Sequence, residues 1–530
     1  MFSNRRLIIL VLLILFSAYM FFTGIANNAL WEEDEVWYVQ VAREMADSGD
    51  YATLTFAGEK FFHKPPLFYW LLAISGKVFG FNEFSMRLVS ALSAIGIVIL
   101  AFFIGEMLFS TAVGVFSGLI LATSFQFFVQ AKLAYIEPLL VLFMTLAFFF
   151  FIKGYLEKKH GYYILFYAAV ALATLTKGPI GILLPAGSIF LFLLFRKEFK
   201  EILSVFFNWG LLVYAVITLP WYLIETSLYG KEFWLEHFGY HQFTRFAKGA
   251  ETHAEPWYYN FVSLFLGFLP WSTFLPAGLL LAARKIRQKE ILLTILWAAV
   301  IFVFFTISVS KLPGYLLPAF VPLAILIAKL IVGFIRNEEG VSWAGIFGSF
   351  GFLFVLLVSV AATFLYTVST KGPEVLGGYQ DALNTLIPFV YILAGGGVAG
   401  LLAFLWRPKK PYFFLAVILW VVIVNLYFMY NIVPLVESFR PMKPLGVKIS
   451  EIAQPGDKVI CYDYYSRGLL YYSGRLIQEA AKPEAVIQLL KGPGKVYVVM
   501  YDAHWEKLKD KIGKKASVVY QKNHGVLISN

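Results

Sequence analysis

An acidic cluster, Glu32–Glu35, opens a segment whose apolar residues recur with helical spacing at positions 38, 41, 42 and 45. That spacing predicts an amphipathic helix. Acidic residues at the start of a helix are favoured by its dipole, but four adjacent acids exceed what capping requires. We therefore expect the cluster to bind a cation, whether a metal ion, a lysine or a positively charged substrate.

A lysine with restricted backbone freedom follows at Lys64. Pro65 and Pro66 fix an extended turn directly after His63 and Lys64. A lysine held in this way is a natural ligand for a phosphate group. A lysine whose ammonium simply reaches for water is the alternative interpretation of this segment.

Further polar residues lie beside apolar stretches, namely Lys132, Glu137, Lys177, Lys311 and Tyr315. A separate polar segment contains Glu236, His237, His241, Arg245 and His253. Three histidines in one segment, with His63 elsewhere, make a metal site a hypothesis. Ordinary solvated histidines are the alternative.

The sequence gives no sign that a nucleotide supplies the energy for a reaction at these residues. The chain contains no GxxxxGK[ST] motif, so nothing indicates hydrolysis of ATP or GTP. The energy must then arrive in the substrate, and an activated lipid supplies it. Lipid phosphates lie at the membrane interface, which suits the lysines and arginines described above.

Composition shows which scaffold positions these residues. Apolar residues make up 59% of the chain and charged residues only 15%, whereas soluble domains carry about 25% charged residues. The chain is therefore an integral membrane protein, and a purely soluble enzyme or a disordered chain is excluded. The net charge of +11 is expected to orient loops rather than bind nucleic acid. Cys461 is the single cysteine, which excludes an intrachain disulfide.

Stretches of roughly 20 apolar residues predict membrane-spanning helices. About thirteen are expected, near 7–29, 84–108, 111–130, 138–153, 162–177, 179–195, 204–224, 257–282, 290–310, 314–335, 343–369, 385–406 and 411–433. Short basic loops, such as 196–200 and 407–410, mark the cytoplasmic side. The N-terminus is then cytoplasmic, and the longer loops 31–83 and 225–256 face outwards. These features predict a transmembrane domain over 1–433.

The remaining residues, 434–530, differ from the preceding segments in their pattern of apolar and polar residues. Alternating runs such as KVYVVMY and HGVLIS predict strands, and WEKLKDKI predicts a short helix. We expect a small α/β domain outside the membrane. Its basic character suits contact with anionic membrane lipids, although plain solubility explains it equally well.

Ion-coupled transporters place ionisable residues at mid-membrane depth, whereas here they gather at the outer ends of spans. That distribution favours an enzyme at the membrane surface over a transporter. A flippase for a lipid-linked sugar remains the non-enzyme alternative.

Several motifs follow one another between about residues 30 and 320, namely DEVWYVQVAREMADSGDY, FFHKPPLFYW, LTKGPIGILLP, WYLIETSLYGKEFWLEHFGYHQFTRF, PWYY and SVSKLPGYLLP. In this order they resemble bacterial membrane glycosyltransferases of the aminoarabinose transferase type. Those enzymes are related to protein O-mannosyltransferases and share the GT-C fold. The resemblance implies that a sugar is taken from a polyprenyl phosphate at the outer, periplasmic face of the bacterial inner membrane. It implies no nucleotide and no nucleic-acid partner.

The resemblance also assigns roles to individual residues. It implies catalytic carboxylates at Asp34, Glu35 and Glu137, the last standing where an aspartate is usual. The residues implied as ligands of the donor phosphate are Lys64, Arg245, Tyr315 and Lys311.

Two departures from the family pattern concern Trp37 and His63. Trp37 stands in place of an arginine, and His63 in place of a glutamate that contributes to a metal site in similar enzymes. A divalent metal, zinc or similar, is therefore expected on His63 and His241.

The leading expectation is transfer of 4-amino-4-deoxy-L-arabinose to a lipid A phosphate, with inversion at the anomeric carbon. The acidic cluster suits a cationic sugar and suits galacturonic acid poorly unless a metal intervenes. Mannose or galacturonic acid as the sugar, and the lipopolysaccharide core or a protein as the acceptor, remain alternatives.

Overall fold

The computed structural model describes residues 4–32, 34–248, 254–339, 341, 343–375, 380–405, 410–463 and 466–530. Glu33, His253 and most of the basic loop at 407–410 lie outside the described residues.

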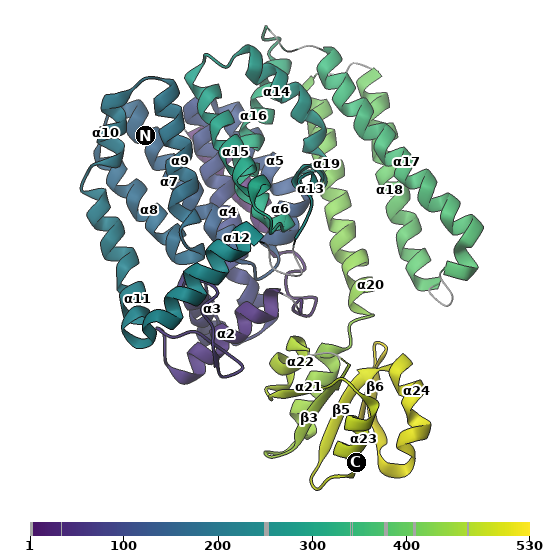
Figure 1. Ribbon diagram of the computed structural model, residues 1–530. Coiled ribbons are helices and arrows are strands. Elements are labelled where there is room, and N and C mark those ends of the chain that lie inside the picture. Colours follow the sequence, from purple (N-terminus) through teal and green to yellow (C-terminus); the bar gives the residue numbers. More distant parts are fainter. Residues whose placement is uncertain are drawn as a thin grey trace.

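Helices dominate the chain up to residue 437, and Figure 1 shows them as a bundle of long, roughly side-by-side rods. Their bounds are α1 Asn4–Phe22, α4 Glu83–Leu108, α5 Thr111–Thr123, α6 Phe125–Ala131, α7 Ile136–Glu157, α8 Gly161–Lys177, α9 Ile180–Phe195, α10 Phe199–Phe206, α11 Gly210–Phe233, η1 Trp234–Thr244, α12 Arg245–Lys248, α13 Tyr259–Gly267, η2 Trp271–Phe274, α14 Leu275–Arg284, α15 Lys289–Ile307, η3 Pro313–Leu316, α16 Leu317–Ile335, α17 Trp343–Val375, α18 Gln380–Leu405, α19 Lys410–Tyr427, η4 Phe428–Ile432 and α20 Val433–Glu437.

Seven of the described helices are long and apolar enough to cross a membrane, and two bent pairs raise that number to nine. The bent pairs are α5 with α6, and α13 with the helices over 271–284. Every expected span coincides with helical structure, but α8 and α9 are shorter apolar helices. The protein is therefore a multi-pass helical membrane protein, whereas the count of thirteen spans and the cytoplasmic N-terminus stay predictions.

The segment 31–83 folds into a small structure of its own at one end of the bundle. It contains α2 (Asp34–Ser48), a two-stranded ribbon of β1 (Thr55–Phe56) and β2 (Glu59–Lys60), and α3 (Leu67–Phe79). The apolar face of α2 is buried against α3, as the periodicity predicts.

A buried ion pair joins this segment to the bundle. The Glu35 carboxylate accepts hydrogen bonds from Arg87 Nε at 2.9 Å and from Arg87 Nη2 at 2.8 Å. Both side chains are at most 2% exposed. The backbone amides of Trp31 and Ala134 also donate to Glu35. Because the pair is bidentate and fully hydrogen-bonded, it fixes the position of α2.

The C-terminal region forms an open five-stranded sheet with helices on both faces (Figure 1). Its elements are α21 Met442–Ile452, β3 Lys458–Tyr462, α22 Arg467–Ser473, β4 Ile477–Ala480, α23 Pro483–Lys491, β5 Val496–Tyr501, α24 Asp502–Ile512, η5 Gly513–Lys515, β6 Ser517–Lys522 and β7 Gly525–Ser529. The strand order is β4-β3-β5-β7-β6, with the first three parallel. The domain boundary at 433 and 434 and a periplasmic location stay predictions.

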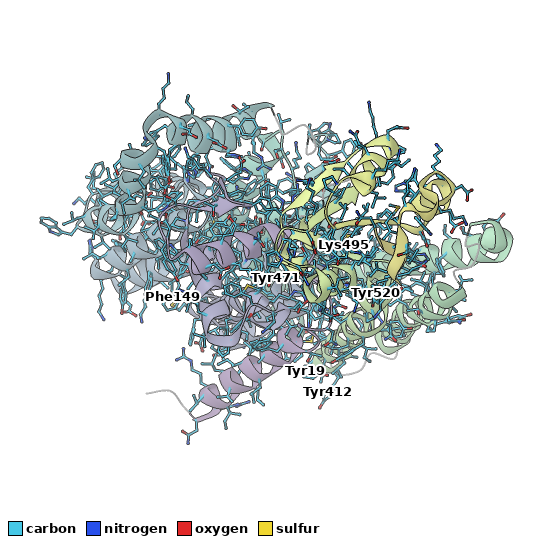
Figure 2. The ribbon with its side chains drawn as sticks, turned by 90° about the horizontal axis from the view of Figure 1, so that it is seen from below. Tyr19, Phe149, Tyr412, Tyr471, Lys495 and Tyr520 are labelled. Carbon is cyan, nitrogen blue, oxygen red and sulfur yellow. The ribbon has the colours of Figure 1, made fainter. Side chains whose placement is uncertain are left out.

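The sheet region packs against the segment 31–83. Tyr472 Oη accepts from the amide of Leu30 at 2.8 Å, and Arg43 donates to the carbonyl of Tyr471 at 2.9 Å. Figure 2 places Tyr471 where the purple N-terminal segments meet the yellow-green C-terminal ones. The two regions are thus joined by hydrogen bonds from separate parts of the chain.

Candidate functional site

One cavity of about 260 Å³ collects the basic residues that the sequence singles out. Lys64, Lys177, Arg245 and Tyr315 line it, and His241 lies on its wall. These residues come from the turn before α3, the end of α8, the start of α12 and η3. Apolar side chains of α9 and α15 complete the lining, which suits a ligand with a charged head and an apolar body.

Lys64 is held at this cavity by the two prolines that follow it. Pro66 caps α3, so the turn ends where the helix begins. Burial and the charges of Lys177 and Arg245 lower the pKa of the Lys64 ammonium to about 7, while Glu137 and Asp34 oppose that shift. The five ionisable groups therefore share one electrostatic neighbourhood, although they are distant in the sequence.

Glu137 reaches this neighbourhood through Lys177. Lys177 Nζ lies 2.6 Å from Glu137 Oε1, and both residues are buried. The same ammonium lies 4.4 Å from the ring centroid of Tyr315, a cation–π distance. Lys177 is thus neutralised by Glu137, which leaves Lys64 and Arg245 as the cations of the cavity that form no ion pair within the described part of the chain.

Two glycines permit the close approach of these elements. Gly178 ends α8 with φ +85°, a conformation that side chains rarely adopt. A Cβ at Gly314 would lie 2.7 Å from Gln130 Nε2 and 3.4 Å from Glu137 Cγ. Glycine at 314 therefore allows η3 to bring Tyr315 against the start of α7.

His237 and His241 lie in a π-helical stretch, η1, that runs directly into α12, where Arg245 is the first residue. π-Helical turns are rare and concentrate at functional sites. His237 is fully buried, and its Nδ1 donates to the carbonyl of Phe62 at 2.7 Å. This bond ties η1 to the turn that carries Lys64, and it makes His237 a positioning residue.

Asp34 and Glu35 have different surroundings although they are adjacent. Asp34 is the exposed first residue of α2, and its charge acts on Tyr38, Tyr69 and Lys64. Glu35 is buried with Arg87 as described above. The expectation of a catalytic Glu35 therefore does not fit the geometry, because both of its oxygens are engaged in fixing α2.

Lys311 also differs from its expected role as a ligand of the donor phosphate. Its ammonium donates to the carbonyls of Ser308 at 2.6 Å and Glu255 at 3.0 Å, and the side chain is buried. Lys311 does not belong to the lining of the cavity. It holds the chain between α15 and η3 in place, next to Tyr315.

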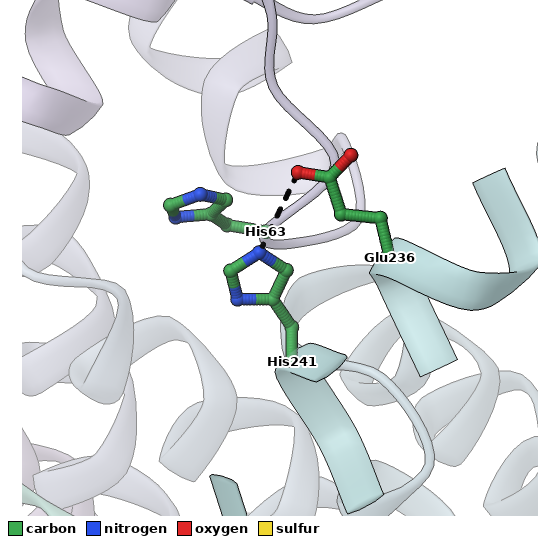
Figure 3. Close-up of side chains that lie close together, drawn as sticks. All are labelled: His63, Glu236 and His241. Carbon is green, nitrogen blue, oxygen red and sulfur yellow. Dashed lines mark ion pairs between the residues drawn. The ribbon is translucent and has the colours of Figure 1, made fainter. Parts of the chain in front are cut away.

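His63, Glu236 and His241 form the candidate metal centre (Figure 3). One possible ligand atom from each residue lies within 4.8 Å of the others, and the ring centroids of His63 and His241 are 3.9 Å apart. Burial and neighbouring cations lower the pKa of His63 to about 2, so its ring is neutral and able to donate a lone pair. Two imidazoles and one carboxylate match the ligands that zinc takes at catalytic sites, so these residues fit a divalent cation.

The C-terminal region reaches this centre through Arg467. Its guanidinium lies 4.7 Å from the ring of Trp37, and the Trp37 ring lies 5.1 Å from that of His63. The tryptophan that replaces the family's arginine thus stacks under an arginine from another part of the chain.

Sequence reasoning named Lys177 and Glu236 as polar residues but assigned neither a catalytic, phosphate-binding or metal-binding role. Lys177 is followed by Gly178 and Pro179, the same kind of fixed turn that drew attention to Lys64. Glu236 lies five residues before His241, and only a π-helix, with its i to i+5 hydrogen bonds, aligns that spacing.

Comparison of the chain with known proteins identifies its relatives. Residues 63–224 match the family model described as dolichyl-phosphate-mannose-protein mannosyltransferase. An undecaprenyl phosphate-alpha-4-amino-4-deoxy-L-arabinose arabinosyl transferase of Pseudomonas fluorescens strain Pf0-1 is 30% identical over 415 residues, which cover 77% of this chain and 73% of the relative. The chain belongs to the family of these undecaprenyl phosphate-aminoarabinose arabinosyl transferases. A second relative of that name, from P. fluorescens strain Pf-5, is 32% identical over 62% of this chain and 60% of its own length.

A crystal structure described as ArnT from Cupriavidus metallidurans bound to undecaprenyl phosphate shares the fold of this glycosyltransferase. Its TM-score is 0.79 at 22% identity, over 98% of this chain and 97% of that one. The chain is therefore a membrane glycosyltransferase of GT-C fold that depends on a polyprenyl-phosphate sugar.

Proposed function

We propose that this enzyme transfers 4-amino-4-deoxy-L-arabinose from undecaprenyl phosphate to a phosphate group of lipid A at the periplasmic face of the inner membrane. The observation that carries the proposal is the joint lining of one cavity by Lys64, Arg245 and Tyr315. The sugar and carrier follow the names of the relatives at about 30% identity.

The charges of the cavity suit the charge change of this reaction. The donor is a phosphodiester with one negative charge, and the departing undecaprenyl phosphate is a monoester with nearly two. Lys64 and Arg245, helped by the Tyr315 hydroxyl, therefore stabilise the leaving group more than the donor. Binding that strengthens during the reaction lowers the barrier.

The bond changes balance without a cofactor. An oxygen of the acceptor phosphate attacks the anomeric carbon, and the bond from that carbon to the carrier phosphate breaks. The electron pair stays on the carrier phosphate, and single displacement inverts the configuration. A phosphate acceptor is already ionised, so Asp34 orients the cationic amino sugar; with a hydroxyl acceptor Asp34 would be the general base.

We also propose that His63, Glu236 and His241 bind a divalent cation, with zinc as the best match. A cation bound there would supply one more positive charge beside the cavity. The protein purified without added chelator should contain about one zinc per chain by elemental analysis. His241→Ala should lose the metal, whereas His504→Ala, in the sheet region, should keep it; equal zinc in both would refute the site.

Purified protein, synthetic undecaprenyl-phosphate aminoarabinose and lipid A, followed by mass spectrometry of the lipid, test the function. The proposal expects aminoarabinose on a lipid A phosphate. Transfer of mannose or galacturonic acid instead, or transfer only to the lipopolysaccharide core or a protein, would replace the sugar or the acceptor. Movement of the lipid-linked sugar across vesicles without any transfer would support the flippase.

A further inference from the structure

Two uncharged polar side chains, Ser310 and Gln242, line the same cavity as Lys64 and Arg245. Within the described ranges of the chain, neither Ser310 Oγ nor Gln242 Nε2 has a hydrogen-bond partner, and both atoms are buried. A buried polar atom without a partner destabilises a fold, because it has given up its hydrogen bonds to water. Such atoms are uncommon in native proteins, so two of them on one cavity indicate a ligand that completes them.

The segment that carries Ser310 is held in place by other groups. Ser308 Oγ donates to the carbonyl of Ser310 at 3.0 Å, and the amide of Val309 donates to the carbonyl of Phe246 at 3.0 Å. Phe246 directly follows Arg245, so the second bond joins the segment of Ser310 to the helix that begins with Arg245. The Ser310 hydroxyl takes no part in these bonds and is not needed to hold the segment.

Gln242 reaches the cavity from the π-helical stretch η1, three residues before Arg245. Its amide packs against Gly178, where a Cβ would lie only 2.9 Å from Gln242 Nε2. Glycine at 178 therefore leaves room for this amide at the end of α8, next to Lys177. The amide nitrogen is fixed by this packing and not by a hydrogen bond.

The two unpartnered groups share one chemical property, which is hydrogen-bond donation. The amide nitrogen of glutamine has two N–H groups and no acceptor, and the serine hydroxyl has one O–H group. Lys64 and Arg245 beside them are also donors without acceptors. The ligand that complements this set is an anion with several acceptor oxygens, which describes a phosphate group.

We propose that Ser310 and Gln242 bind the phosphate of the polyprenyl carrier as neutral donors beside Lys64 and Arg245. This inference rests on the proposed function, which puts the carrier phosphate in this cavity. The donor phosphodiester has two free oxygens. When the bond to the sugar breaks, the bridging oxygen becomes a third one, so the departing phosphate accepts more hydrogen bonds than the donor. Ser310 and Gln242 therefore stabilise the leaving group in particular.

Native mass spectrometry of the full-length protein in detergent, titrated with undecaprenyl phosphate, tests this contact without requiring turnover. Ser310→Ala and Gln242→Met should each weaken binding about tenfold, because one hydrogen bond to a charged group is lost. Undecaprenol has the same chain without the phosphate, and it should bind both variants and the wild type alike.

A second measurement separates a ligand contact from a structural one. Without ligand, Ser310→Ala should unfold at the temperature of the wild type or above it, because the lost hydroxyl has no partner in the described part of the fold. Undecaprenyl phosphate should raise the melting temperature of the wild type by more than that of the variant. A serine that only supports the fold would show the reverse, with lower stability and an unchanged response to ligand.

Ser272→Ala is the matched control. Ser272 is 1% exposed, and its hydroxyl also lacks a partner among the residues that the structure describes. It lines a separate, mainly apolar cavity. Its variant should bind undecaprenyl phosphate like the wild type.

Equal affinity of Ser310→Ala, Gln242→Met and Ser272→Ala for undecaprenyl phosphate would overturn the inference, and equal losses for undecaprenol would do the same. If those variants bind like the wild type while the enzyme transfers aminoarabinose to lipid A, the inference fails and the proposed function stands. If the affinities fall as expected but no sugar reaches lipid A, the proposed function fails and the phosphate contacts stand.

Discussion

Replacing Lys64 by methionine tests the leaving-group role of the cavity. Methionine keeps most of the length of lysine and removes the charge, so the turn fixed by Pro65 and Pro66 should persist. The donor phosphate gains about one negative charge as the sugar leaves. A cation about 4 Å from that charge contributes about 4 kcal/mol at an effective dielectric constant of about 20.

That energy corresponds to about three orders of magnitude in rate. Part of it is offset because Arg245 and Tyr315 remain in the cavity. We therefore expect kcat/KM for the donor to fall by about 10²–10³, the range found when one donor to a developing charge is removed. Lys64→Arg should retain most activity, because the positive charge stays.

Lys60→Met is the matched control for this prediction. Lys60 lies four residues earlier and pairs with Glu232 at 2.8 Å, with 44% of its side chain exposed. Solvent screens an exposed pair of this kind, and Lys60 does not line the cavity, so activity should stay close to that of the wild type. The assay is transfer of labelled sugar under donor-limited conditions. A Lys64→Met enzyme as active as Lys60→Met would refute the reasoning.

Three further predictions follow from the packing around the site. Arg87→Met leaves Glu35 as an unpaired buried charge, so thermal unfolding should show a loss of about 3–5 kcal/mol; an unchanged melting temperature would contradict a structural Glu35. Gly314→Ala forces a Cβ to 2.7 Å from Gln130 Nε2 and should raise the donor KM about tenfold by moving Tyr315, whereas an unaltered KM would exclude this close approach. Tyr315→Phe removes the hydroxyl that the proposal places beside the donor phosphate and should lower kcat/KM for the donor by about 10²-fold in steady-state assays; wild-type kinetics would remove Tyr315 from the proposed ligands.

The helices were predictable from the sequence because a membrane span needs a long apolar stretch and little else. Lys64, Arg245 and Tyr315 were predictable as a group from the motifs that carry them, and the structure places them on one cavity. Their roles stay predictions.

Other residues could not be assigned from the sequence, for reasons of geometry. Asp34 and Glu35 are neighbours, and consecutive helical residues point about 100° apart, so only packing decides which one meets Arg87. Lys177 and Lys311 both stand beside glycine or proline turns, yet one lines the cavity and the other binds carbonyls. The contact of the C-terminal sheet with residues 29–32 depends on tertiary structure alone.

A cryo-electron microscopy reconstruction of the full chain with undecaprenyl phosphate bound would test the central claim most directly. The account predicts phosphate density within hydrogen-bonding distance of Lys64, Arg245 and Tyr315, in the cavity between α8, α12 and η3. Phosphate density at any other place, with those three side chains making no contact to it, would contradict the account.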